Sequence, residues 1–72
     1  MEEKILVSPH ETKGFTLHKG YFYKVLPMDN DGVKAGRVEI KCNIMSEGSE
    51  DESCVAINHN DSEATIEIYK KV

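Results

Sequence analysis

Two cysteines carry the most reactive side chains in the sequence. Cys42 and Cys54 flank an acidic stretch, and directly opposed residues of an antiparallel strand pair share a face, so the strand register decides whether the two meet. Pairing Cys42 with Cys54 turns Val55 and Ile57 outward, whereas pairing Cys42 with Val55 keeps both in the core. The second register buries more apolar surface, worth about 1.5–3 kcal/mol per large side chain. It predicts two free thiols, with Cys42 buried and Cys54 more exposed, as suits a reducing cytosol.

Three histidines, His10, His18 and His59, add candidate ligands for zinc. The histidines and cysteines lack the short C-x-x-C or H-x-x-x-H spacing from which one local segment builds a zinc site. We interpret the histidines as scattered surface residues. We therefore expect neither a metal nor a cofactor.

The segment Asp29–Gly32 has a composition that suggests a calcium loop. Aligning Gly32 with the invariant glycine of an EF-hand loop places Pro27 at the first ligand position and Val38 at the last, where a bidentate glutamate is required. Asn, Asp and Gly are also the residues that tolerate positive φ or hydrogen-bond their own backbone in turns. The segment Met28–Gly32 is therefore predicted to be a turn.

Neither catalysis nor nucleic-acid binding has strong support in the residue pattern. A catalytic nucleophile needs a base and an orienting group around a pocket, and the Ser, Cys, His and Asp residues here are not grouped, so we expect no enzyme. The formal net charge is −4, whereas a sequence-independent grip on nucleic acid needs clustered Lys and Arg. A stacking surface of Tyr21, Phe22 and Tyr23 between lysines is the alternative. Nucleic acid is thus a disfavoured partner.

An acidic loop separates the two cysteines. The segment Ser46–Ser53 has no apolar residue, so it is predicted to be a solvated, mobile loop. Its acids are Glu47, Glu50, Asp51 and Glu52. A tip that keeps the protein soluble accounts for such a loop. The alternative is that these four acids dock on a basic protein surface, which would make the binding sensitive to salt.

The stretch Gly20–Met45 contains the best-patterned strand. Residues 37–44 alternate strictly between apolar and polar side chains, which puts one set in the core and the other in water. The apolar set is Val38, Ile40, Cys42 and Ile44. The segment Tyr21–Leu26 is aromatic and β-branched on both faces, which indicates a more central strand that is covered on both sides or lies at an interface. We expect the two segments to form one hairpin around the Met28–Gly32 turn.

Four further runs are rich in β-forming residues: Lys4–Ser8, Phe15–Leu17, Cys54–Asn58 and Ala64–Tyr69. No segment has a convincing helical period. The sequence therefore predicts an all-β fold, a small antiparallel β-sandwich or open barrel of five to six strands, with residues 1–72 as a single small domain. The predicted inward positions are Ile5 or Val7, Phe15, Leu17, Tyr23, Val25, Val38, Ile40, Cys42, Ile44, Val55, Ile57, Ile66 and Ile68.

More large apolar residues are present than one core face of this size needs. The surplus is Tyr21, Phe22, Leu26, Met28 and Tyr69, and such surplus surface marks contacts with another subunit or a partner. We predict interaction residues in two groups, Tyr21, Phe22, Tyr23 and Tyr69 on the aromatic strands and Glu47, Glu50, Asp51 and Glu52 on the acidic loop.

These residues suit a non-enzymatic protein-interaction or assembly component that acts as a homo-oligomer, of the kind found among viral or phage accessory and structural proteins. The alternative is a small inhibitor or regulator that binds one macromolecular target through the acidic loop or the aromatic strand. No apolar run approaches the roughly 20 residues that span a bilayer, and Met1–Lys4 has no signal-peptide character. We therefore expect no membrane partner and a cytoplasmic location in the producing or host cell.

Overall fold

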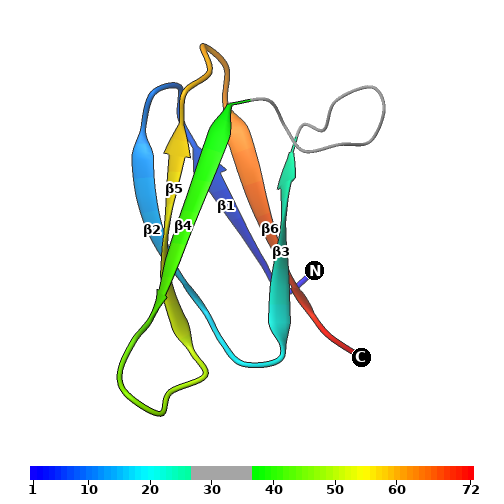
Figure 1. The fold of residues 1–72 in the computed structure, drawn as a ribbon. Coiled ribbons are helices and arrows are strands. Elements are labelled where there is room, and N and C mark those ends of the chain that lie inside the picture. The colour runs from blue at the N-terminus through cyan, green and yellow to red at the C-terminus, as the bar shows by residue number, and fades with distance from the viewer. Residues whose placement is uncertain (27–36) are drawn as a thin grey trace.

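Alternating apolar and polar residues form six β-strands in the part of the chain that the structure, a computed structural model, describes. These are residues 1–26 and 37–72. The strands are β1 (Glu3–Val7), β2 (Thr12–Leu17), β3 (Tyr21–Leu26), β4 (Val38–Ile44), β5 (Glu52–Asn58) and β6 (Ala64–Lys70) (Figure 1). The predicted all-β fold is confirmed. Within the same residues, no helix is long and apolar enough to cross a membrane.

The strands form two antiparallel sheets of three strands each. One sheet has the order β1-β6-β3 and the other has the order β2-β5-β4. The sheets lie as two layers, with β4 and β5 in front of β1 and β6 in the view of Figure 1. This arrangement is consistent with the predicted sandwich or open barrel.

The predicted hairpin of β3 and β4 is wrong, because the two strands belong to different sheets. β3 pairs with β6, and β4 pairs with β5. The segment 27–37 between them is longer than the roughly 2–5 residues usual in hairpin loops, so it does not force its flanking strands to pair. β3 is also an edge strand of its sheet rather than a central one. The predicted turn Met28–Gly32, with its calcium-like Asp29–Gly32 segment, lies outside the described residues.

The pairing of β4 with β5 follows the register that buries less apolar surface. Cys42 lies opposite Cys54, and the two form a disulfide with their Cα atoms 4.1 Å apart. The predicted free thiols are therefore wrong, and so is the register that was expected to keep Val55 and Ile57 in the core. Both side chains are half-buried on the outward face of β5, while Cys54 and Ala56 are buried.

Asn58 explains why β5 adopts this register. Its side chain is fully buried, and its Nδ2 donates hydrogen bonds to the carbonyls of Val7, Ser8 and Ser62 at 3.1, 3.2 and 2.9 Å. Its Oδ1 accepts a bond from the backbone N–H of Asn60 at 3.0 Å. A polar group left without a partner away from water is costly, and both the Asn58 side chain and the Val7 carbonyl are buried. Turning Asn58 outward would leave these groups unpaired, and that cost offsets the apolar surface gained from Val55 and Ile57.

The core is small and lies between the two sheets. Its buried centre consists of Val7, Ala56, Ile66 and Ile68, and the half-buried residues packed against it are Ile5, Phe15, Leu17, Tyr21, Val25 and Ile40. Val38 is buried as predicted, but Ile44 is 63% exposed. Ile44 lies opposite Glu52 at the end of β4 next to the acidic loop. Its side chain points to the inner side of the sheet, but the other sheet does not cover this end of the strand.

Candidate functional site

The outward face of the β1–β6–β3 sheet carries an ordered set of large and charged side chains. Because side chains alternate along each strand, the cross-strand pairs of this face form three rows. The rows are Phe22 opposite Tyr69, then Lys4 and Lys24 on either side of Glu67, then Leu6 and Leu26 on either side of Thr65. We call these eight residues the outer sheet face.

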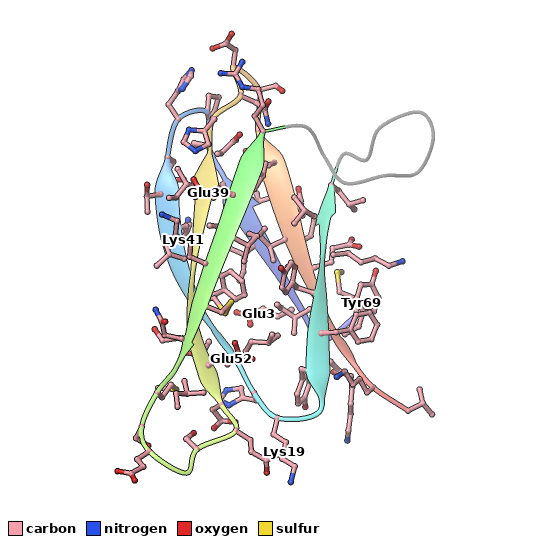
Figure 2. All side chains as sticks on the ribbon, in the orientation of Figure 1. Glu3, Lys19, Glu39, Lys41, Glu52 and Tyr69 are labelled. Carbon is pink, nitrogen blue, oxygen red and sulfur yellow. A yellow bond between two sulfur atoms is a disulfide. The ribbon has the colours of Figure 1, made fainter. Side chains whose placement is uncertain are left out.

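An aromatic pair lies at one end of the outer sheet face. The rings of Phe22 and Tyr69 stack with their centroids 5.5 Å apart and their planes at 19°. The Nζ of Lys24 lies 5.3 Å from the centroid of the Tyr69 ring, close enough for a cation–π contact. Figure 2 shows Tyr69 on the side of the sheet that points away from the other layer. The pair is therefore accessible to a partner molecule.

The Tyr69 hydroxyl is held by its neighbour on the same strand. It donates a hydrogen bond of 2.6 Å to Oε1 of Glu67. This bond favours the protonated hydroxyl, and together with partial desolvation and the nearby carboxylate charge it raises the pKa of Tyr69 above its ordinary value. Glu67 thereby links the aromatic pair to the row of charges beside it.

The remaining rows combine opposite charges with exposed apolar groups. Glu67 lies directly between Lys4 and Lys24, and opposite charges that face each other across strands stabilise a sheet modestly. Leu6 is 46% exposed and Phe22 is 38% exposed. The outer sheet face therefore offers apolar surface beside charges of both signs.

The structure separates the predicted aromatic residues into two groups. Phe22 and Tyr69 lie on the outer sheet face, whereas Tyr21 and Tyr23 turn toward the other sheet. Tyr21 packs against the core. Tyr23 makes an edge-to-face contact with Phe15, with the ring centroids 6.2 Å apart, and remains 37% exposed.

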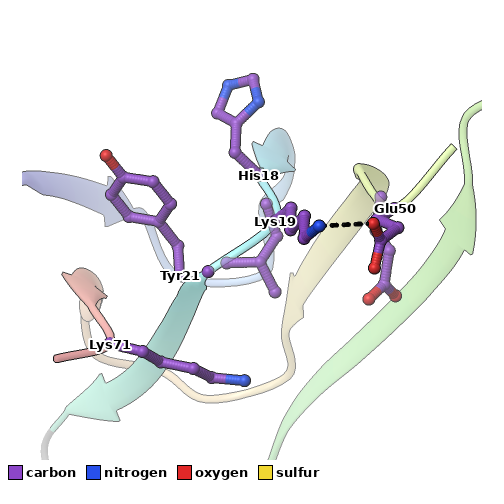
Figure 3. Close-up of a pocket in the computed structure, with 8 residues that line it drawn as sticks. His18, Lys19, Tyr21, Glu50 and Lys71 are labelled. Carbon is purple, nitrogen blue, oxygen red and sulfur yellow. Dashed lines mark ion pairs between the residues drawn. The ribbon is translucent and has the colours of Figure 1, made fainter.

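The acidic loop contacts the turn between β2 and β3. Nζ of Lys19 forms an ion pair with Glu50 at 2.7 Å (Figure 3). The backbone N–H of Lys19 donates a hydrogen bond to Oδ1 of Asp51 at 2.9 Å. His18 lies 3.4 Å from the other Asp51 oxygen. The Lys19 bond and, to a lesser degree, His18 lower the pKa of Asp51.

The four predicted acidic residues therefore differ from one another. Glu47 and Glu50 are exposed, as a solvated loop requires, but Asp51 and Glu52 are half-buried, and Glu52 belongs to β5. Glu50 and Glu52 line a cavity of about 230 Å³ together with His18, Lys19, Tyr21 and Lys71. This cavity is polar and carries both signs of charge.

The outward face of the β2–β5–β4 sheet is different in character. Glu39 lies 3.2 Å from Nε2 of His59 and 3.3 Å from Nζ of Lys41, and these contacts lower its pKa, with the His59 hydrogen bond the largest cause. Figure 2 shows Glu39 and Lys41 along this face. On this face Glu39 and Lys41 lie opposite the half-buried Ile57 and Val55, whereas the outer sheet face exposes Leu6 and Phe22.

Sequence reasoning missed Leu6, Lys4 and Glu67 as members of a common surface. The sequence does contain a sign of Leu6, because Leu6 lies between Ile5 and Val7 in the alternation of β1 and so points outward when those two point inward. Finding the rows also requires the knowledge that β6 lies between β1 and β3, which no local pattern supplies.

No protein-family model, no curated protein and no solved structure matches the chain.

Proposed function

We propose that this chain is a non-enzymatic protein-interaction module that assembles with further copies of itself through the outer sheet face. The exposure of Leu6 and Phe22, beside the half-buried Leu26 and Tyr69, is the observation that supports this most directly. The opposite side of the same sheet already supplies the core through Val7, Ile66 and Ile68 among others. Apolar residues that gather on one exposed face mark interaction sites, whereas singly scattered ones do not.

A second copy of the chain is the occupant that the charges favour. The central row presents an ammonium group, a carboxylate and a second ammonium group on three neighbouring strands, Lys4, Glu67 and Lys24. Strands in a sheet lie about 4.8 Å apart. A second copy displaced by one strand therefore places a lysine of one copy against Glu67 of the other. The same surface then serves both subunits, as a two-fold dimer requires.

The size of the molecule is compatible with such a contact. A stable interface buries roughly 800 Å² on each partner. The molecule measures 37 × 26 × 18 Å along its principal axes, so a face bounded by the two longer axes has room for that area. A contact of this size would cover Leu6, Phe22 and the Tyr69 ring together.

The alternative function, an inhibitor or regulator of one macromolecular target, has less support from the acidic loop. Glu50 and Asp51 already contact Lys19 and His18 within the chain. The loop therefore offers a partner less unpaired charge than four acids suggest. The aromatic strand supports this alternative through Phe22, which belongs to the outer sheet face, and through Tyr23, which is 37% exposed.

The mass of the protein in solution tests the proposal. We expect the wild-type chain to sediment as a dimer or larger closed oligomer, and the double variant Leu6→Lys/Phe22→Lys to dissociate at least about a hundredfold more readily, because two apolar contacts per subunit are lost. Ile44→Lys is the matched control, since Ile44 is 63% exposed but lies on the other sheet.

Two results would contradict the proposal. A wild-type chain that stays monomeric over the whole concentration range excludes self-association. An oligomer that Ile44→Lys disrupts, while Leu6→Lys/Phe22→Lys leaves it intact, places the contact on the β2–β5–β4 sheet instead. Circular dichroism of each variant shows that the β-sheets are retained.

A further inference from the structure

The described residues hold one group of side chains with the composition of a metal site. The sulfur atoms of Cys42 and Cys54 and a carboxylate oxygen of Glu52 lie within 4.8 Å of one another. Their placement follows from the strand register, because Cys42 lies opposite Cys54 and Glu52 precedes Cys54 by two residues on the same face of β5. In the disulfide, the two sulfurs are not available as ligands, since metals bind the thiolate.

We propose that reduction of the Cys42–Cys54 disulfide converts this group into a binding site for a thiophilic divalent cation such as Zn²⁺. Two thiolates and one carboxylate supply three of the four ligands of a tetrahedral zinc ion, and water supplies the fourth. This inference concerns the inner side of the β2–β5–β4 sheet and does not depend on assembly through the outer sheet face.

The reducing step requires two equivalents of a small thiol. The first thiolate attacks Sγ of Cys42, which is half-buried on the edge strand β4, and the S–S bond breaks with Cys54 leaving as a thiolate. The second thiolate attacks the sulfur of the first thiol in the mixed disulfide, which releases Cys42 and leaves the two small thiols joined as their own disulfide. Each cysteine thiol then gives its proton to solvent when the cation binds.

The geometry of the three side chains fits a small ion. With Zn–S distances of about 2.3 Å and Zn–O distances of about 2.0–2.2 Å, tetrahedral ligand atoms lie roughly 3.4–3.8 Å apart. All the ligand atoms lie within 4.8 Å of one another. After reduction, the two sulfurs, which are bonded in the disulfide, move apart to about 3.8 Å, and the Glu52 oxygen approaches them by up to about 1 Å through side-chain rotation. The antiparallel register already holds both cysteines in place during that change.

The protein excludes water from the Cys54 sulfur, while a cavity beside Glu52 lets an ion enter. Cys54 is 1% exposed, so its thiolate lies in a region from which water is excluded. Glu52 lines the cavity of about 230 Å³ shown in Figure 3. That cavity gives an ion a path to the carboxylate and leaves room for the water ligand. A purely structural disulfide does not require a carboxylate beside it.

Co²⁺ and Zn²⁺ titrations of the full chain test the inference. We expect the protein reduced with a phosphine to bind one Co²⁺ with thiolate-to-cobalt charge-transfer absorption, to release it to Zn²⁺, and to show neither signal while the disulfide is intact. Glu52→Gln keeps both cysteines and should weaken Zn²⁺ binding by at least about tenfold, since loss of a ligand costs no less than loss of an outer-shell group.

Glu50→Gln is the matched control, because Glu50 lines the same cavity but pairs with Lys19 and is not in the ligand group. The inference is overturned if reduced and oxidised protein bind Co²⁺ equally, or if Glu50→Gln weakens binding as much as Glu52→Gln. It is also overturned if the reduced chain loses its β-sheet circular dichroism and Zn²⁺ does not restore it. Restoration by Zn²⁺ supports the site.

Discussion

The two sheets of the sandwich have the same number of strands and the same antiparallel pairing, yet different groups hold their central strands in register. In β6, the residues Ala64, Ile66 and Ile68 turn inward and are buried, as their alternation predicts. In β5, the inward set is Cys54, Ala56 and Asn58, and the larger apolar residues face outward. Apolar burial therefore sets the register of one sheet, whereas a disulfide and a buried amide set the register of the other.

The difference extends to the outward faces. The outer sheet face of β1–β6–β3 exposes Leu6 and Phe22, while the outward face of β2–β5–β4 carries the Glu39 contacts with Lys41 and His59. In the β1–β6–β3 sheet, the inward residues already form the core, so its further apolar residues Leu6 and Phe22 lie on the outward face. In the β2–β5–β4 sheet, the outward Ile57 and Val55 instead lie opposite the charged Glu39 and Lys41. Substitutions at each of these groups test whether the two sheets are held differently.

The largest expected effect is that of Asn58→Ala. It removes the four side-chain hydrogen bonds of a fully buried residue and leaves carbonyls of Val7, Ser8 and Ser62 without their donor. The buried Val7 carbonyl left unpaired costs about 1–3 kcal/mol, and each of the three part-buried hydrogen bonds contributes about 0.5–1.5 kcal/mol. We therefore expect the free energy of unfolding to fall by about 3–5 kcal/mol. Urea denaturation measures the change.

Asn43→Ala is the control for this substitution. Asn43 is exposed on the outward face of β4, so its replacement should change the unfolding free energy by less than about 0.5 kcal/mol. Equal effects of Asn58→Ala and Asn43→Ala would show that the buried amide does not hold the register of β5.

The second effect is that of removing the disulfide. The double variant Cys42→Ala/Cys54→Ala opens a loop with a sequence separation of 12, and cross-links of this length contribute about 2–4 kcal/mol by restricting the unfolded chain. We expect a loss of that size in the free energy of unfolding. Amide hydrogen exchange should show the loss of protection in β4 and β5 before β1 and β6.

Uniform loss of protection across both sheets would contradict this expectation. It would mean that the disulfide stabilises the sandwich as one unit and that the two sheets are not held by separate groups. The oxidised wild-type protein, measured in the same buffer, is the reference.

The smallest effects come from exposed ionisable groups, and the two sheets should respond at opposite ends of the pH scale. The pKa of Glu39 is lowered by His59 and Lys41, so its contribution to stability is present above the ordinary glutamate pKa of about 4.3 and is lost as pH falls through the lower folded value. The pKa of Tyr69 is raised, so its contribution is present below about 10 and is lost as pH rises through the higher folded value.

Thermal unfolding at a series of pH values separates these two contributions. Glu39→Gln should flatten the acid limb of the stability profile, and Tyr69→Phe should flatten the alkaline limb. Each variant should leave the other limb unchanged. If Tyr69→Phe alters the acid limb instead, the Tyr69–Glu67 hydrogen bond is not the source of the alkaline dependence.

Local patterns predicted the strands well and their partners poorly. The β-forming runs and the turn residues between them predicted the all-β class with five to six strands. The structure extends the predicted Phe15–Leu17 run to Thr12–Leu17 and begins β5 at Glu52 rather than Cys54. The pairing of β3 with β6 joins residues 39 to 49 positions apart, and no local pattern encodes such a contact. The hairpin prediction was wrong because it treated neighbours in sequence as neighbours in a sheet.

The register of β5 shows a second limit of sequence reasoning. Counting apolar residues favoured Val55 and Ile57 as core residues, but Asn58 finds partners only after the Val7–Ser8 and Ser62 carbonyls have come together. The candidate surface shows the same limit. Phe22 and Tyr69 were predicted as contact residues, yet their stacking depends on strands that only the complete sheet brings together.

The central position of β6 has a consequence for the order in which the molecule can be made. β6 is the last of the six strands in sequence, and both β1 and β3 pair with it. On the ribosome, β1 and β3 therefore emerge before their shared partner, with Phe22 and their open backbone edges exposed. β4 and β5 are joined by a short loop and can pair as soon as both have emerged. Pairing between strands far apart in sequence is slow, and strand edges that stay unpaired meanwhile are prone to aggregation. Insertion of β6 between β1 and β3 is thus the step at which a nascent chain is most vulnerable.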